Sequence, residues 1–222
     1  AELENIDGLS GVTTENVRVT DNLKLNLCGG LTPLFQSIGV SDLISLFNYG
    51  NIKLSGNGAG CSLKNILPGF PYDQKCLGST TLSSQAEVDG FDCPVVTGTL
   101  KISGTDITNL SGLSGLQKVG QLIIENNPNL TNLDGLSSLD SIQGSNETSV
   151  AYLFIRNNAS LSNIDGLSSL TSMQATFFTE IRIDNNPSLT NLNGLSSLRE
   201  FYWVKDGFIV ITNNETLSDI NG

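Results

Sequence analysis

The side chains that could do chemistry are few in this chain. None of its 222 residues is a histidine, so the commonest general base and a major metal ligand are absent. Ser-His-Asp, Cys-His and His-Glu-x-x-His chemistry are therefore excluded within the chain. The carboxylates Asp7, Asp134 and Asp165 recur at one turn position of a repeated pattern, which favours a scaffolding role over acid–base catalysis. No D-x-D-x-D loop suggests a calcium site, so we expect no metal site. Because the chain has no histidine and its repeated carboxylates read as scaffold, we also expect no enzymatic activity and no cofactor.

The four cysteines are the other reactive side chains: Cys28, Cys61, Cys76 and Cys93. None belongs to a C-x-x-C pair, which argues against a zinc site. An even number of cysteines in a chain rich in Ser, Thr and Asn suggests two disulfides and an oxidising compartment. Three pairings are possible, and we favour the sequential one, Cys28–Cys61 with Cys76–Cys93. Four free, buried thiols are the alternative.

Charge restricts the class of partner. The chain has 22 acidic and 11 basic residues and a formal net charge of −11. This balance argues against a nucleic-acid partner, which needs clustered Lys and Arg, and against docking on anionic lipid. No apolar run approaches the roughly 18 residues of a membrane helix, so we expect no membrane insertion within this segment. No signal peptide is visible, although the chain starts within a repeat and one could have been removed upstream.

A repeated line of about eighteen residues must position these side chains. Copies begin at Leu100, Leu122, Leu153, Ile181 and Ile209, and the starts are separated by 22, 31, 28 and 28 residues. Each copy opens with alternating apolar residues, which predicts a strand too short to be stable alone. Stacked copies would instead form a parallel sheet with one shared core. Four asparagines are expected to point inward and bond backbone groups of adjacent coils: Asn127, Asn158, Asn186 and Asn214. The Asp-Gly or Asn-Gly pairs at 134–135, 165–166 and 193–194 are read as turn signals.

This line, as in "LIIENNPNLTNLDGLSSL" from residue 122, resembles the leucine-rich repeat class and, more closely, its irregular variant, the receptor L domain. It is most similar to receptor-L-like surface proteins secreted by Gram-negative bacteria, in which "NNPxLTNLDGLSSLTSI" recurs after a segment such as "TLSSQAEVDGF…GTLKISGTDITNL". Residues 81–110 match that segment. The resemblance is strong over residues 80–222 and looser over 1–75. It implies a β-solenoid of leucine-rich-repeat type, with a short-strand parallel sheet, irregular coils and Cys-linked helical caps, in a secreted or cell-surface protein.

Two repeat arrays are predicted. Residues 1–75 read as the last coils and Cys-flanked C-terminal cap of a first array, and 76–222 as the N-terminal cap and coils of a second, receptor-L-like array. Ser84 and Glu87 have the spacing of a capping box, which predicts a short helix that caps the second array. Both ends read as open coils, so we expect a fragment of a longer protein. One continuous solenoid interrupted by a Cys-rich insertion is the alternative.

Candidate binding residues lie at positions that vary between copies. Outward-facing strand positions would line the inner curve of the sheet and place four side chains on adjacent rungs: Phe154, Arg156, Arg182 and Asp184. The alternative is a solvated ladder of charge pairs, Glu125–Arg156–Asp184. Insertions before the strands are expected to form extra loops on one edge and to contribute a second, aromatic set: Phe177, Phe178, Tyr202 and Trp203. A local mini-core is the alternative for that set.

Of five N-x-S/T sequons, only Asn146, in the longest insertion, looks free for a glycan, and only in a eukaryotic host. Taken together, the sequence predicts an extracellular, non-catalytic recognition or adhesion module that binds a protein or carbohydrate at a cell surface. A structural repeat segment of a surface layer, stalk or filament, working by self-assembly, is the alternative.

Overall fold

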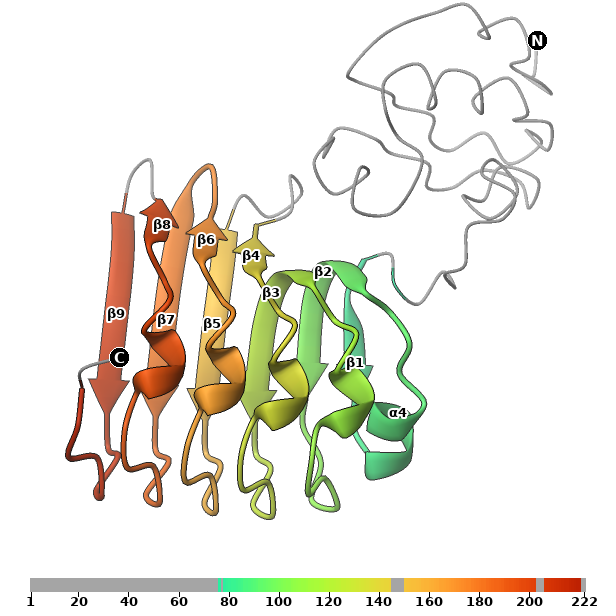
Figure 1. Ribbon diagram of the computed structural model, residues 1–222, viewed down its shortest axis with the longest axis vertical. Helices are drawn as coiled ribbons and strands as arrows, with labels where there is room; N and C mark the ends of the chain where they lie inside the picture. Colours follow the sequence, from blue (N-terminus) through green and yellow to red (C-terminus); the bar gives the residue numbers. More distant parts are fainter. Residues whose placement is uncertain (1–75, 77, 145–149, 203–205, 221–222) are drawn as a thin grey trace, which may run out of the picture. The chain divides into compact units, whose positions relative to one another are not determined.

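The structure is a computed structural model that describes residues 76, 78–144, 150–202 and 206–220 (Figure 1). The chain divides into two compact units, Ala1–Gln74 and Lys75–Gly222. All described residues belong to the second unit. The predicted first array and the Cys28–Cys61 pair therefore lie outside the described residues, as do Asn146 and Trp203.

The second unit is built on one sheet in which every strand pairing is parallel. Its strands run in the order β8-β6-β4-β3-β5-β7-β9, with β2 also beside β3 and β1 beside β2. This architecture confirms the parallel sheet and agrees with a solenoid-like receptor L domain fold. The strands are β1 (Thr80–Leu82), β2 (Val95–Ile102), β3 (Lys118–Glu125), β4 (Ser141–Gln143), β5 (Val150–Arg156), β6 (Ser172–Gln174), β7 (Phe178–Asp184), β8 (Glu200–Tyr202) and β9 (Asp206–Thr212).

Each coil contributes a short and a long strand segment to the sheet. Strand β3 shows both, because Lys118 at its start pairs with Ser141 of β4, whereas Leu122 nearer its end pairs with Leu153 of β5. In β2 and β3 the two segments are continuous. In the later coils an insertion separates them, so that β4, β6 and β8 form the short-strand ladder and β5, β7 and β9 continue the long-strand ladder.

The insertions, expected as extra loops, are partly strand. Strands β5, β7 and β9 begin at Val150, Phe178 and Asp206, three residues before the repeated line starts. These three residues are register partners of one another across the stack. The expectation of loops was wrong here because neighbouring coils carry insertions at the same place, so each extension finds the partner strand that satisfies its backbone hydrogen bonds.

The turns between strands carry stacked 3-10 helices, which lie in front of the long strands in Figure 1. A Cβ atom on Gly166 would lie 1.8 Å from the carbonyl oxygen of Leu133 in the preceding coil, and Gly135 is placed in the same way against Leu110. Neither glycine has a positive φ. They are therefore required for close approach between coils, and not for the turn conformation that the Asp-Gly pairs suggested. The helices are η4 (Ser111–Leu113), η5 (Asp134–Leu136), η6 (Asp165–Leu167) and η7 (Asn193–Leu195).

The core lies between the strands and the 3-10 helices. In the second coil Leu122 and Ile124 face inward from β3, Leu130 and Leu133 follow in the turn, and all four have no exposed surface. The equivalent residues of the coil that starts at Leu153 are buried to the same extent. Short strands add a further inward row: Val119, Ile142 and Met173. Since each coil covers the apolar side of the next, stacking supplies the interior that a single coil lacks.

A buried asparagine ladder runs through the turns, as predicted. Asn158 has no exposed surface, and its Oδ1 accepts hydrogen bonds from the backbone N and the Nδ2 of Asn127 at 3.1 and 3.0 Å. Its Nδ2 donates to the carbonyl of Ile124 at 3.0 Å and to Oδ1 of Asn186 at 3.2 Å. Each preceding asparagine adopts a left-handed conformation, with φ between 54° and 59°, which Asn tolerates better than other non-glycine residues: Asn126, Asn157, Asn185 and Asn213.

A short helix and a disulfide precede the stack. Helix α4 (Gln85–Asp89) begins after Ser84, whose side chain accepts a hydrogen bond from the backbone N of Glu87, as the capping box predicts. The reciprocal bond differs, because Glu87 Oε2 accepts from the backbone N of Ser83 at 2.6 Å. Cys76 and Cys93 form the disulfide that sequential pairing predicts. That the helix acts as a cap of the array stays a prediction.

Candidate binding surface on the long strands

The outward side chains of the long strands form rows that cross from strand to strand. This register places Phe154 and Arg156 of β5 beside Arg182 and Asp184 of β7, as the repeat spacing predicted. Their role in binding stays a prediction. The rows are Tyr152, Glu180 and Phe208; then Lys101, Ile123, Phe154, Arg182 and Val210; and then Glu125, Arg156, Asp184 and Thr212.

Three side chains stack along strand β5. The rings of Tyr152 and Phe154 are nearly parallel, with centroids 4.7 Å apart and an interplanar angle of 20°. The guanidinium carbon of Arg156 lies 5.5 Å from the centroid of the Phe154 ring, within the range of a cation–π contact. Residues at i, i+2 and i+4 of a strand share one face, so the pleat of β5 aligns two rings and one cation.

The aromatic side chains continue onto the neighbouring strands. Phe178 of β7 contacts Tyr152 edge-on at a centroid distance of 6.1 Å, and lies 5.6 Å from Phe208 of β9. Phe208 is 52% exposed, and Phe177, just before β7, is 49% exposed. We call Tyr152, Phe154, Phe178 and Phe208 the aromatic patch. It spans three strands and combines mutual ring packing with accessible apolar surface.

Glu125 connects cations on the two strands that flank β3. Its Oε1 lies 2.6 Å from Nζ of Lys101, and its Oε2 accepts from Nε of Arg156 at 2.5 Å. Its side chain is only 9% exposed. Burial raises the pKa of Glu125, but hydrogen bonds from Lys101 and Arg156 and their positive charges outweigh burial, so the pKa lies below the usual glutamate value.

The second arginine has a separate partner. Arg182 donates through Nε and Nη2 to Oε1 of Glu180, at 3.0 and 2.8 Å. Asp184 accepts instead from Thr212 Oγ1 and Asn213 Nδ2, and these bonds, with the nearby arginine charges, hold its pKa below the usual aspartate value. The predicted Glu125–Arg156–Asp184 ladder is therefore formed only at its first pair. Two neutral donors, Thr212 at the end of β9 and Asn213 directly after it, bind Asp184, and the sequence pattern does not show them.

The second predicted set of binding residues is divided between the two ladders. Tyr202 ends β8 and is in register with Gln174 of the short-strand ladder, so it does not belong to the long-strand rows. Phe178 was assigned to an edge loop, but it shares the long-strand face with the aromatic patch. Tyr152 and Glu180 were missed as candidates, although period-two alternation is visible in "VAYLFIR" and "FTEIRID".

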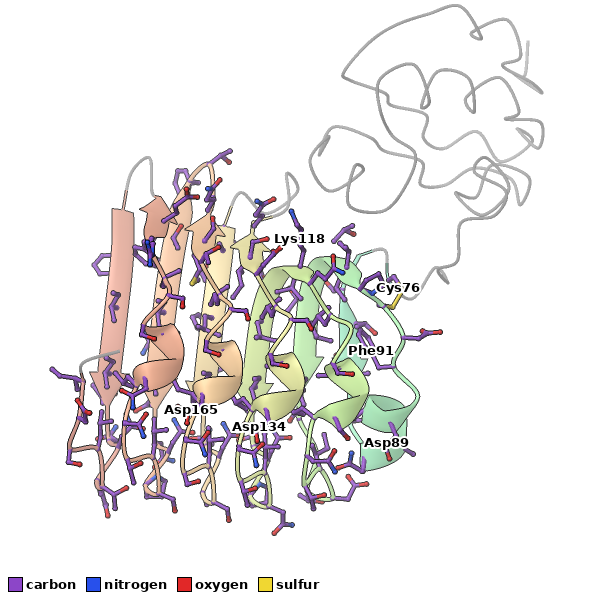
Figure 2. The ribbon with its side chains drawn as sticks, in the orientation of Figure 1. Cys76, Asp89, Phe91, Lys118, Asp134 and Asp165 are labelled. Atoms are coloured by element: carbon purple, nitrogen blue, oxygen red, sulfur yellow. A yellow bond between two sulfur atoms is a disulfide. The ribbon has the colours of Figure 1, made fainter. Side chains whose placement is uncertain are left out.

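Neither a metal site nor a membrane span is found in the part of the chain that the structure describes. No group of three or more His, Cys, Asp or Glu side chains there could hold a metal ion. No described helix has both the length and the apolar character to cross a membrane. Asp134 and Asp165 begin η5 and η6 on the turn side of successive coils (Figure 2), which is the placement of a repeated scaffold residue.

Comparison with protein families identifies one match. Residues 92–197, which run from before β2 to just after η7, match the family described as Receptor L domain, and this match supports a receptor L domain in that segment. Receptor L domains are extracellular, non-enzymatic modules that bind protein ligands. No curated protein and no solved structure matches the chain.

Proposed function

We propose that the segment matching the receptor L domain family belongs to a secreted or cell-surface recognition module, and that this module binds a protein partner on the solvent-facing side of its long strands. The observation that carries the proposal is the aromatic patch. Aromatic residues are 6% of the chain, yet four of them contact one another on one sheet face, next to two arginines. Aromatic and arginine side chains dominate the binding energy of protein interfaces.

Ring orientation favours a protein partner over a carbohydrate. A sugar ring stacks on an open aromatic face, but the Phe154 ring already contacts the Tyr152 ring at 4.7 Å and the Arg156 guanidinium at 5.5 Å. Phe178 and Tyr152 form a T-shaped contact, with an interplanar angle of 74°. Ring edges and partly exposed ring sides can instead pack against apolar side chains of a protein. A preformed sheet also loses little conformational entropy on binding, which benefits affinity.

The test needs two double variants that add the same negative charge: a face variant, changed in the aromatic patch, and a control, changed on the turn side. Phe154→Asp with Phe208→Asp places two carboxylates on the patch. Ser138→Asp with Ser169→Asp adds two carboxylates at exposed positions on the turn side, where neither serine makes a hydrogen bond within the described residues. All three proteins are first compared by circular dichroism and thermal unfolding, so that a binding loss is not a folding loss.

Binders are selected against the wild-type chain from a display library of small folded domains. We expect selected domains to bind the face variant at least tenfold more weakly and the control with unchanged affinity. Equal binding to both variants would overturn the proposal. Selective binding of the wild type on a glycan array, lost in the face variant, would assign a carbohydrate partner instead. Concentration-dependent self-association that only the face variant abolishes would favour the structural role.

A further inference from the structure

We propose that the partner presents an acidic side chain next to an apolar one, with the carboxylate received by Arg156 and Arg182 and the apolar group by the aromatic patch. This inference rests on the proposed function and specifies the chemistry of the partner. It follows from the hydrogen-bonding state of the two guanidinium groups, from their fixed position beside Phe154, and from the distribution of charge in the domain.

Both arginines retain unused donors. Arg156 donates only its Nε, to Glu125, and Arg182 donates Nε and Nη2 to a single oxygen of Glu180. Among the described residues, both Nη atoms of Arg156 and Nη1 of Arg182 have no acceptor. The two side chains are 37% and 38% exposed, so these N–H groups are accessible from solvent. A guanidinium with free N–H groups matches a carboxylate in shape and charge.

The carboxylates that hold the arginines are themselves withdrawn from solvent. Side chains of Glu125 and Glu180 are only 9% and 12% exposed. Glu125 accepts from Nε of Arg156, and Glu180 accepts from Nε and Nη2 of Arg182. The remaining Nη groups are left for a partner. Arg156 is also held over the ring of Phe154. Because both cations are already oriented, a carboxylate of the partner would bind them with little further loss of side-chain freedom.

The arginines and the aromatic patch are adjacent. Arg182 is the register partner of Phe154, and Arg156 follows Phe154 by two residues on the same strand. Rows two residues apart along a strand are separated by about 6.6 Å, which is also the spacing of side chains at i and i+2 in an extended segment. An acidic residue and an apolar residue on one face of a partner segment can therefore reach both features together.

Charge distribution makes this face the favourable approach for an acidic group. Residues 76–222 contain six Lys or Arg and fifteen Asp or Glu. The long-strand rows hold three of these cations, Lys101, Arg156 and Arg182, and three of the carboxylates, Glu125, Glu180 and Asp184. They are therefore balanced in charge within a domain that is acidic elsewhere. Asp184, the neighbouring carboxylate, is directed to Thr212 and Asn213. Charges beyond about 8 Å are largely screened at physiological salt, so the acidic residues elsewhere in the domain oppose a carboxylate bound at the free guanidinium N–H groups only weakly.

The probe is a phage-displayed library of random linear dodecapeptides, selected against the wild-type chain in 150 mM salt. We expect enrichment of Asp or Glu one or two positions from Phe, Leu, Ile or Met. A synthetic copy of an enriched peptide should lose at least tenfold in affinity when its acidic residue becomes Asn or Gln. It should also bind more weakly as salt is raised to 500 mM.

Protein variants test whether binding depends on the two guanidinium groups themselves or only on positive charge. Arg156→Gln with Arg182→Gln should weaken the peptide at least tenfold, and the two Arg→Lys replacements, which keep charge but remove the fork, should give an intermediate loss. Lys118→Gln with Arg199→Gln removes the same charge away from the long-strand rows and should change affinity less than twofold. Thermal unfolding of each variant confirms that it folds.

Two outcomes would overturn the inference. Enriched peptides that are neutral or basic would do so, as would unchanged affinity in the double Arg→Gln variant. If peptides lose binding to Phe154→Asp with Phe208→Asp but not to the arginine variants, the proposed function stands and only the acidic partner is wrong. If peptides bind every variant equally, both the proposed function and this inference fail.

Discussion

The Nδ2 of Asn158 donates to Oδ1 of Asn186, 28 residues later, at 3.2 Å, and neither side chain has any exposed surface. The same contact joins Asn127 to Asn158 and Asn186 to Asn214. Each side chain also binds backbone groups of its neighbours. These asparagines thus connect each coil to the next. This explains why every repeat from the second onward has an asparagine at this position.

Removing one member of the ladder should destabilise the stack. Asn158→Ala leaves the backbone N of Asn127 and the carbonyl of Ile124 buried without their side-chain partner. At about 1–3 kcal/mol for each unsatisfied buried group, we expect the free energy of unfolding to fall by about 2–4 kcal/mol. Urea unfolding followed by circular dichroism measures it. Ser160→Ala, an exposed neighbour, serves as the control and should change stability by less than about 0.5 kcal/mol.

Because neighbouring coils approach closely at Gly166, adding a single methyl group there should strongly destabilise the fold. Gly166→Ala brings a Cβ to 1.8 Å from the Leu133 carbonyl oxygen, so the coils must separate or shift. Overpacking of this kind costs about 1–3 kcal/mol, or more where backbone is the obstacle. Gly115→Ala is the matched control, because no atom lies within 4 Å of its added Cβ. Thermal unfolding should show a lower midpoint for Gly166→Ala only; similar midpoints would contradict the packing of the turns.

The lowered pKa of Glu125 predicts a pH-dependent contribution to stability. Because its folded-state pKa lies below the ordinary glutamate value, the ionised form stabilises the fold above that value, and the contribution is lost as pH falls through the folded pKa. The difference in free energy of unfolding between wild type and Glu125→Gln should therefore be positive near pH 7 and shrink below pH ~4. Urea titrations across this pH range measure it.

In a variant that lacks both cations, the contribution of Glu125 to the free energy of unfolding should change with pH in the opposite direction. In Lys101→Gln with Arg156→Gln, burial is the remaining influence on Glu125, and it raises the pKa. The Glu125 carboxylate should then destabilise the fold near pH 7 and cease to do so once it is protonated. A pH dependence that is the same in both backgrounds would show that the cations do not set the pKa of Glu125.

The disulfide should stabilise the start of the stack. Cys76 and Cys93 are separated by 17 residues, and a crosslink over a loop of this size contributes about 3 kcal/mol in the chain-entropy description. The double replacement Cys76→Ala with Cys93→Ala should lower the free energy of unfolding by that order. Hydrogen exchange followed by mass spectrometry should show faster exchange in β1 and α4 than in β5. Uniform protection in the variant would mean that the disulfide does not hold this end.

Several features of the fold could be predicted because they depend on local residue type. Apolar alternation located the strands, the second asparagine of each pair was expected to be buried, and Ser84 was expected to begin a helix. Sequence spacing alone also placed Phe154 and Arg156 beside Arg182 and Asp184, since equivalent positions of stacked copies must fall in register. A repeat determines its own register, so these predictions needed no knowledge of distant contacts.

Other features depend on which coil lies next to which. The insertions became strand because the insertion in the next coil pairs with them, which moved Phe178 onto the face that carries Tyr152. Asp184 turned to Thr212 and Asn213 of the following coil, although its charge suggested Arg156. The amino-acid sequence by itself determined that units stack, and in what register. Only the tertiary structure decided which side chains of neighbouring units share hydrogen bonds and ring contacts, because competing partners at similar distance are resolved by packing geometry.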